Sequence, residues 1–139
     1  APARRAATPA QAAASLGPRR LRRPVDGRII RPFGEGVGAR KNAGVDIAAP
    51  VGAPVVAAAE GRIAFVSDPT SPVGAVVLMT HPGGMTTIYG RLTDILVSPG
   101  QSIAAGAPLA RVAPRAGGRS ALHFELRHGS DPVNPTPFL

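Results

Sequence analysis

The chain has 139 residues, which is enough for one ordinary domain and too few for two sizeable ones. It contains no cysteine, which excludes disulfide bonds and thiolate metal sites, and no apolar run approaches the roughly 20 residues that cross a bilayer. Its net charge of +8 is unevenly placed, because eight arginines and one acid, Asp26, precede Pro32, whereas eight basic and seven acidic residues follow. The basic excess therefore belongs to the N-terminal part.

Residues 1–20 are rich in Ala, Pro and Arg and lack apolar periodicity. This composition is typical of a flexible linker or arm. A basic arm is also suited to contact nucleic acid, anionic lipid or an acidic cell-wall polymer. The rest of the chain contains one Tyr and four Phe without interleaved basic positions, so we expect no specific nucleic-acid binding.

A globular pattern begins near Leu21, and we predict one domain over residues 21–139. Gly and Pro recur at short intervals, and the runs between them are rich in Val and Ile, which is typical of β-structure. No convincing helical stripe follows residue 21. The expected fold is compact and all-β, either a barrel or a sandwich. The predicted strands are Pro54–Ala59, Gly61–Ser67, Ala75–Thr80, Met85–Tyr89, Pro108–Val112 and Leu122–Arg127.

Residues 81–84, His-Pro-Gly-Gly, lie between two predicted strands and are expected to form a hairpin turn. We interpret His81 as structural and His128 as an exposed turn residue. In the last predicted strand apolar and polar residues alternate. Its polar residues His123, Glu125 and Arg127 are therefore predicted to share one face, and its apolar residues the other.

Several segments, taken in chain order, resemble one family of metallopeptidases. These segments are Pro32–Gly34, Gly44–Val55, Ala59–Ile63, Val76–His81, Thr87–Tyr89, Val97–Ile103, Gly106–Ala110, Leu122–Arg127 and Asp131–Pro135. Through them, residues from about 24 to 139 resemble the LytM (lysostaphin-like, M23) domain. The resemblance implies a compact antiparallel all-β fold of the barrel-sandwich hybrid type, with the N-terminal arm outside it.

The resemblance also implies where a zinc site would lie. Active members bind one zinc through the His and Asp of an H-x-x-x-D segment and the second His of an H-x-H segment. Their other catalytic histidines come from a Y-x-H segment and the first His of H-x-H. The corresponding segments here are Asn42–Asp46, Ala121–His123 and Tyr89–Arg91.

Three of these five positions have lost their histidine, because they hold Asn42, Arg91 and Ala121, whereas Asp46 and His123 are kept. An amide oxygen is a poor substitute for imidazole on Zn²⁺, and two remaining ligands hold the metal weakly. The guanidinium of Arg91 cannot act as a base near neutral pH and repels a nearby cation. We therefore expect no metal, no cofactor and no catalysis.

The tyrosine-glycine pair at 89–90 and the ending over residues 124–139 resemble the EnvC-like murein hydrolase activators, a degenerate branch of this family. In that branch the former catalytic groove captures a regulatory helix of a periplasmic N-acetylmuramoyl-L-alanine amidase at the division site. The resemblance implies a periplasmic, non-catalytic amidase activator that acts in cell division and septum splitting. It further implies a division-site membrane complex reached through regions outside this chain.

We predict a partner-binding groove that supplies hydrogen-bond donors and positive charge to an acidic amphipathic helix. Its floor is expected to contain Asn42, Asp46 and His123, and its rim Arg40, Lys41 and Arg91, with Tyr89, Ala121 and Glu125 completing the set. Arg91 is expected to bind a carboxylate with both arms of its guanidinium. Two alternatives stay open, namely a peptidoglycan-binding module that does not cleave and a residual zinc endopeptidase.

Overall fold

A computed structural model describes residues 21–38, 41–67, 74–115 and 119–139. Within these ranges the chain forms β-strands joined by turns and two short 3-10 helices. The strands are β1 (Ile29–Arg31), β2 (Val45–Ala48), β3 (Pro54–Val56), β4 (Gly61–Val66), β5 (Ala75–Thr80), β6 (Met85–Thr93), β7 (Ser102–Ile103), β8 (Pro108–Val112), β9 (Ala121–His128) and β10 (Asp131–Val133). The 3-10 helices are η2 (Pro82–Gly84) and η3 (Thr136–Phe138).

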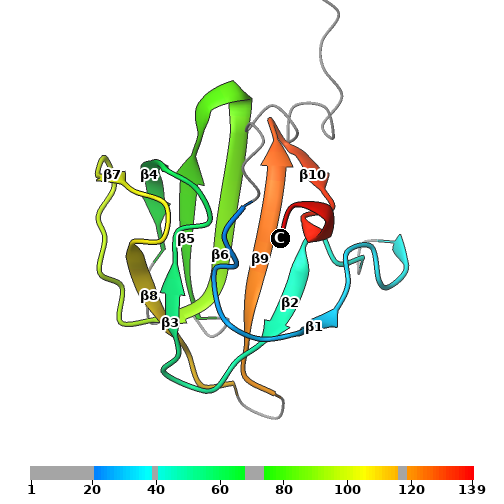
Figure 1. Ribbon diagram of the computed structural model, residues 1–139. Helices are drawn as coiled ribbons and strands as arrows, with labels where there is room; N and C mark the ends of the chain where they lie inside the picture. The colour runs from blue at the N-terminus through cyan, green and yellow to red at the C-terminus, as the bar shows by residue number, and fades with distance from the viewer. Residues whose placement is uncertain (1–20, 39–40, 68–73, 116–118) are drawn as a thin grey trace, which may run out of the picture.

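The strands belong to one antiparallel sheet whose main path runs β1-β2-β9-β6-β5-β4-β7 (Figure 1). Strand β9 has three neighbours, because its first half pairs with β2, its last residues pair with β10, and β6 runs along its other side. Strands β3 and β8 pair with each other, and β8 also pairs with the end of β6. In Figure 1, β3 and the first described segment pass in front of the long central strands.

One face of this sheet forms the core. Alternate residues of the central strands are fully buried there, namely Val45, Ile47, Val77, Met79, Tyr89, Leu122, Phe124 and Leu126. The segment that begins at Leu21 helps to cover this face, since Arg22 N donates to Ala58 O and Val56 N donates to Pro24 O. The intervening residues of β2, β9, β6, β5 and β4 point away from the core, and we call the surface that they form the open face.

A chain of polar groups crosses the core beside β6. His81 Nδ1 lies 2.6 Å from Glu60 O, and His81 Nε2 lies 2.7 Å from Thr87 Oγ1. Thr87 Oγ1 lies 2.9 Å from Tyr89 Oη, which accepts a hydrogen bond from Ala58 N. Burial lowers the pKa of His81, although its bond to the Glu60 carbonyl opposes this, and burial raises the pKa of Tyr89 to about 12. The structural interpretation of His81 is therefore confirmed.

The predicted all-β fold is confirmed, and β5 and β8 have the predicted bounds. Strands β6 and β9 are longer than predicted, β3 and β4 are shorter, and the expected turn at 81–84 contains η2. The short strands β1, β2, β7 and β10 were not predicted. The arm expected at residues 1–20 lies outside the described ranges, so its linker character and the boundary at residue 21 stay predictions.

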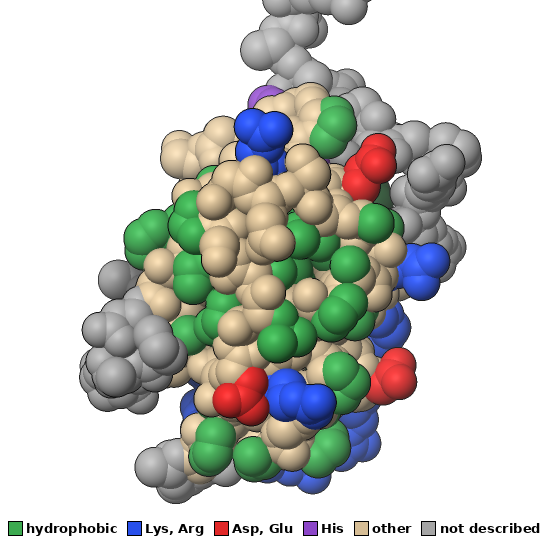
Figure 2. Space-filling view, turned by 90° about the vertical axis from the view of Figure 1, so that its left-hand side faces the viewer, with side chains coloured by type: hydrophobic (Ala, Val, Ile, Leu, Met, Phe, Trp, Pro, Cys, Tyr) green, Lys and Arg blue, Asp and Glu red, His purple; other side chains and the backbone are tan. Residues whose placement is uncertain are grey.

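The outer surface beside β7 and β4 shows hydrophobic side chains dispersed among backbone and other side chains, with charged side chains mainly toward its upper and lower ends (Figure 2). Large hydrophobic residues that are exposed one at a time are normal on a folded domain. In the described part of the chain, no helix is long and apolar enough to span a membrane.

We predict that Tyr89→Phe lowers the free energy of unfolding by about 1–3 kcal/mol, because the buried N–H of Ala58 loses its acceptor while the ring contact with Phe124 remains. Urea unfolding of the two proteins measures the change. The control is Thr86→Val, which removes a partly exposed hydroxyl from the same strand and is expected to change stability by about 0.5 kcal/mol or less. Equal midpoints for the parent chain and Tyr89→Phe would contradict this role of the hydroxyl.

Candidate functional site

Three neighbouring strands bring the central site residues together on the open face. Asp46 of β2 and Gly90 of β6 are both register partners of His123 on β9. The strand pair β2–β9 needs Gly44 just before Asp46, because a Cβ there would lie only 2.1 Å from Phe124 O. Gly90 in turn leaves space beside His123, whose Cβ is 3.4 Å from the place that a Cβ on Gly90 would take. Gly44 thus allows β2 to approach β9 closely, which places Asp46 opposite His123.

His123 lies between two carboxylates. Its Nδ1 is 2.7 Å from Asp46 Oδ1, and its Nε2 is 2.9 Å from Glu125 Oε2. Glu125 Oε1 also accepts a hydrogen bond from Arg127 Nε at 2.7 Å and forms an ion pair with Arg127 Nη2 at 2.6 Å. We call these four residues the Asp46–Arg127 ion-pair chain. Both nitrogens of the His123 ring are engaged, so neither offers a free lone pair.

The contacts within the ion-pair chain favour the ionised form of each of its members. Burial alone would lower the pKa of His123, but the hydrogen bonds and charges of Asp46 and Glu125 raise it to about 9. Burial raises the pKa of Asp46, yet its hydrogen bond to His123 and the nearby cations hold it below its usual value. The hydrogen bond from His123 is also the largest cause that lowers the pKa of Glu125. An imidazolium therefore joins two carboxylates.

Arg91, next to the Asp46–Arg127 ion-pair chain, has an unusual backbone conformation. Its φ of 63° lies in the left-handed region, which costs a non-glycine residue on the order of 1–3 kcal/mol. Arg91 Nη1 is 3.7 Å from Asp46 Oδ2, too far for a hydrogen bond, and this buried nitrogen has no hydrogen-bond partner in the described structure. Burial lowers the pKa of Arg91, with Asp46 opposing it, but a guanidinium stays charged at neutral pH. The hydrogen-bonding capacity of Nη1 is therefore not met within the described structure.

The site carries an excess of positive charge. His123, Arg127 and Arg91 face the two carboxylates of Asp46 and Glu125. The charge of Arg31 also acts on Asp46, and those of Arg31 and Arg115 act on Arg91. A ligand group that neutralises this excess positive charge would be an anion.

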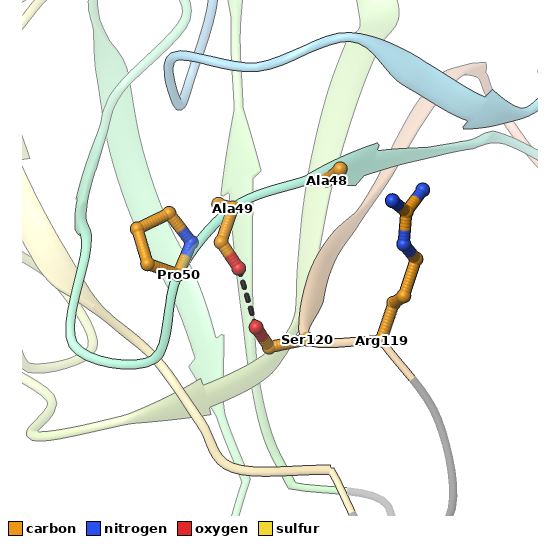
Figure 3. Close-up of a pocket in the computed structure, with 5 residues that line it drawn as sticks. All are labelled: Ala48, Ala49, Pro50, Arg119 and Ser120. Atoms are coloured by element: carbon orange, nitrogen blue, oxygen red, sulfur yellow. Dashed lines mark hydrogen bonds between the residues drawn. The ribbon is translucent and has the colours of Figure 1, made fainter.

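An open pocket of about 410 Å³ continues the site along β2 and β9. It is lined by Ala48, Ala49, Pro50, Arg119 and Ser120 (Figure 3). Ser120 Oγ donates a hydrogen bond of 2.5 Å to Ala49 O, which joins the two segments at the pocket floor. Ala48 pairs with Ala121, two residues along from the Asp46–His123 pair, so the pocket adds a further arginine beside the site.

The structure brings together four of the predicted site residues, Asp46, Arg91, His123 and Glu125, on the open face. Asn42 is buried instead, and its amide holds the adjoining loop: Nδ2 donates to the Arg31 and Pro32 carbonyls at 3.1 and 3.3 Å, and Oδ1 accepts from Gly44 N. Its contact with a partner stays a prediction.

The remaining predicted residues lie elsewhere. Tyr89 is fully buried and faces the core, and Ala121 is also buried. Lys41 is exposed on the loop that precedes β2, whereas Arg40 lies outside the described residues. Arg127 was missed as a site residue, although the alternation of β9 placed it on the same face as His123 and Glu125. The partner contacts of all these residues stay predictions.

The donors at this site do not fit a zinc ion. A catalytic zinc requires three protein ligands and an open position. Here Asn42 is bonded to the backbone, Ala121 has no donor, and both nitrogens of His123 are engaged by carboxylates. Among the described residues, no group of three or more His, Cys, Asp or Glu side chains is arranged to hold a metal.

Comparisons with known proteins agree with this architecture. Residues 40–135 match the model of peptidase family M23. The chain is 37% identical over 118 residues to the murein hydrolase activator EnvC of Escherichia coli K12, covering 84% of this chain and 28% of that protein. It is 30% identical over 116 residues to the murein hydrolase activator NlpD of the same organism, covering 84% of this chain and 30% of that protein.

A solved structure shows the same fold. The crystal structure of a zinc-containing peptidase from Vibrio cholerae superimposes with a TM-score of 0.73 at 29% identity, over 84% of this chain and 39% of that one. The chain therefore belongs to peptidase family M23, and the predicted LytM fold is confirmed. It spans less than a third of the length of the two curated relatives.

We predict that the imidazole of His123 titrates near pH 9 and that Asp46→Asn lowers its pKa, because a neutral amide stabilises the imidazolium less than a carboxylate does. Nuclear magnetic resonance of the histidine rings measures both values. Since the folded pKa exceeds the ordinary value of 6.5, the stabilisation is present below pH 6.5 and is lost as the pH rises through about 9. His81, whose pKa is lowered, is the internal control. A His123 pKa at or below 6.5 would contradict the ion-pair chain.

Proposed function

We propose that this chain is a non-catalytic LytM domain that binds and activates a periplasmic N-acetylmuramoyl-L-alanine amidase during cell division and septum splitting. The observation that carries the proposal is the state of the former metal site, where an imidazolium joins two carboxylates beside an arginine with an unsatisfied N–H group. Such a site is poorly suited to bind a divalent cation and well suited to bind a carboxylate.

The absence of catalysis is supported by the donors rather than by the family, since M23 includes peptidases as well as proteins named activators. Zinc hydrolysis needs a metal-bound water and a neighbouring base. Asp46 and His123 are committed to each other at 2.7 Å, and Arg91 offers no base. The chain would have to break these ion pairs before it could bind zinc with two ligands.

The choice of partner is supported by the relatives and by charge. EnvC and NlpD are named murein hydrolase activators, and the matched region covers 84% of this chain. The excess positive charge around Arg91 fits the acidic residues of a regulatory helix, and a guanidinium binds a carboxylate through two parallel hydrogen bonds. The helix would be drawn away from the active site of the amidase, which activates that enzyme.

The proposed location is the periplasm, where cell-wall amidases act on peptidoglycan. The two curated relatives are more than three times as long as the matched region, since it covers only 28% and 30% of them. We propose that recruitment to a division-site membrane complex depends on regions outside this chain.

We predict that Arg91→Glu abolishes stimulation of the amidase, because it replaces the guanidinium with a carboxylate that repels the acidic helix. Dye release from labelled sacculi by the purified amidase of the same bacterium measures the stimulation. The matched control is Arg111→Glu on β8, an exposed arginine in the layer that covers the core, which should stimulate as the parent chain does. Undiminished stimulation by Arg91→Glu would refute the proposed contact.

We predict that the parent chain retains no stoichiometric zinc after incubation with the metal and dialysis, and releases no peptides from cell walls. The combined variant Asn42→His, Arg91→His and Ala121→His should regain zinc, because it restores the third ligand and removes the guanidinium. Elemental analysis measures the metal. The same variant with His123→Ala is the control and should lose the metal again. One tightly held zinc per parent chain, with cleavage of cell-wall peptides, would show a residual endopeptidase instead.

A further inference from the structure

A row of apolar side chains begins next to the Asp46–Arg127 ion-pair chain and runs across three strands of the open face. Glu125 of β9 is the register partner of Ile88 on β6, Ile88 is the partner of Leu78 on β5, and Leu78 is the partner of Phe65 on β4. Ile88 and Leu78 are half-buried, and Phe65 is 52% exposed. We call Phe65, Leu78 and Ile88 the apolar row.

The apolar row differs from the other exposed hydrophobic residues. Val37, Val51 and Leu96 are also exposed, but each lies in a turn or loop and not in a strand of the sheet. Phe65 is aligned with two further apolar residues in register, and the row leads directly to a charged site. Exposed aromatic and aliphatic side chains that line up beside a charged, hydrogen-bonding site are typical of a binding surface.

The spacing of the row matches an α-helix that lies across the strands. Neighbouring strands are about 4.8 Å apart, and one helical turn rises about 5.4 Å. Residues of a helix at positions i, i+4 and i+7 would therefore meet Ile88, Leu78 and Phe65 in turn. Arg91 lies further along β6 than Ile88, so it would face the flank of the same helix.

We propose that the acidic helix of the partner amidase crosses β6, β5 and β4, with three apolar residues one turn apart on the apolar row and a carboxylate beside Arg91. This inference rests on the proposed function and specifies the pattern by which this chain recognises its partner. The N-terminal arm of the chain itself is a poor occupant, because residues 1–20 contain four arginines and no acid and the site is already positive.

The test is Phe65→Ala, which shortens the most exposed member of the row without disturbing the core. We expect about a ten-fold or greater rise in the concentration of chain that gives half-maximal dye release by the purified amidase, because a buried Phe side chain is lost from the contact. The matched control is Leu96→Ala, which removes a comparably exposed side chain near β8, where Leu96 N donates to Leu109 O. This control should require the same concentration as the parent chain.

A second measurement tests the direction of the helix. A photo-crosslinking benzoylphenylalanine placed at Phe65 and, separately, at Leu78 should capture amidase residues three or four positions apart in one segment. Captured residues two apart, or in unrelated segments, would overturn the crossing helix.

The outcomes separate the two proposals. Unchanged half-maximal stimulation by Phe65→Ala, with stimulation lost in Arg91→Glu, would overturn the apolar row and leave the proposed function standing. An equal loss for Leu96→Ala would also overturn the row, because the effect would not be specific to the open face. No stimulation by the parent chain would overturn the proposed function and this inference with it.

Discussion

The hydrogen-bonded ion pair between His123 and Asp46 is the interaction on which the account of this site depends. It joins β2 to β9 at the centre of the open face, and Glu125 and Arg127 extend it along β9. Two partly buried carboxylates this close to each other require a cation between them. Here the protonated imidazole of His123 supplies that charge. The protein thereby keeps the arrangement of the former metal site, but the side chains there bond to one another.

The weak bonding of Arg91 within the site is a consequence of the same ion pair. With the carboxylates already neutralised by His123 and Arg127, a further guanidinium gains only a weak contact with Asp46, at 3.7 Å. Its left-handed backbone and its unsatisfied nitrogen both cost stability. Strain and unmet hydrogen-bonding capacity of this kind are found at functional sites, where a ligand compensates for them. A carboxylate on a partner fits this position better than a metal or a neutral group.

The fold was largely predictable from the sequence, because strands such as β5 and β9 carry the composition or the alternation that β-structure requires. Strand β2 was missed, since Asp46 interrupts a short apolar segment and its burial makes sense only with His123 opposite. The predicted contribution of Asn42 came from its place in a motif, and its bonds to the Arg31, Pro32 and Gly44 backbone depend on how a loop folds back.

The same limit explains what sequence reasoning left out of the site. The alternation of β9 placed Arg127 beside His123 and Glu125, but its hydrogen bond and ion pair with one oxygen of Glu125 depend on side-chain conformation. The row from Phe65 to Ile88 depends on the register of three strands, including an irregularity between Ile63 and Phe65 in β4. A resemblance to a family locates the positions of a lost metal site, whereas the chemistry that replaced it is visible only in three dimensions.

The most direct test of the central claim is a nuclear magnetic resonance titration of the isotope-labelled chain with the purified amidase and, separately, with zinc. The account predicts that the amidase shifts the signals of the Arg91 side chain and of residues around His123, and that equimolar zinc leaves the His123 ring signals unchanged. Saturation of the His123 signals by one equivalent of zinc, with no response of Arg91 to the amidase, would contradict it.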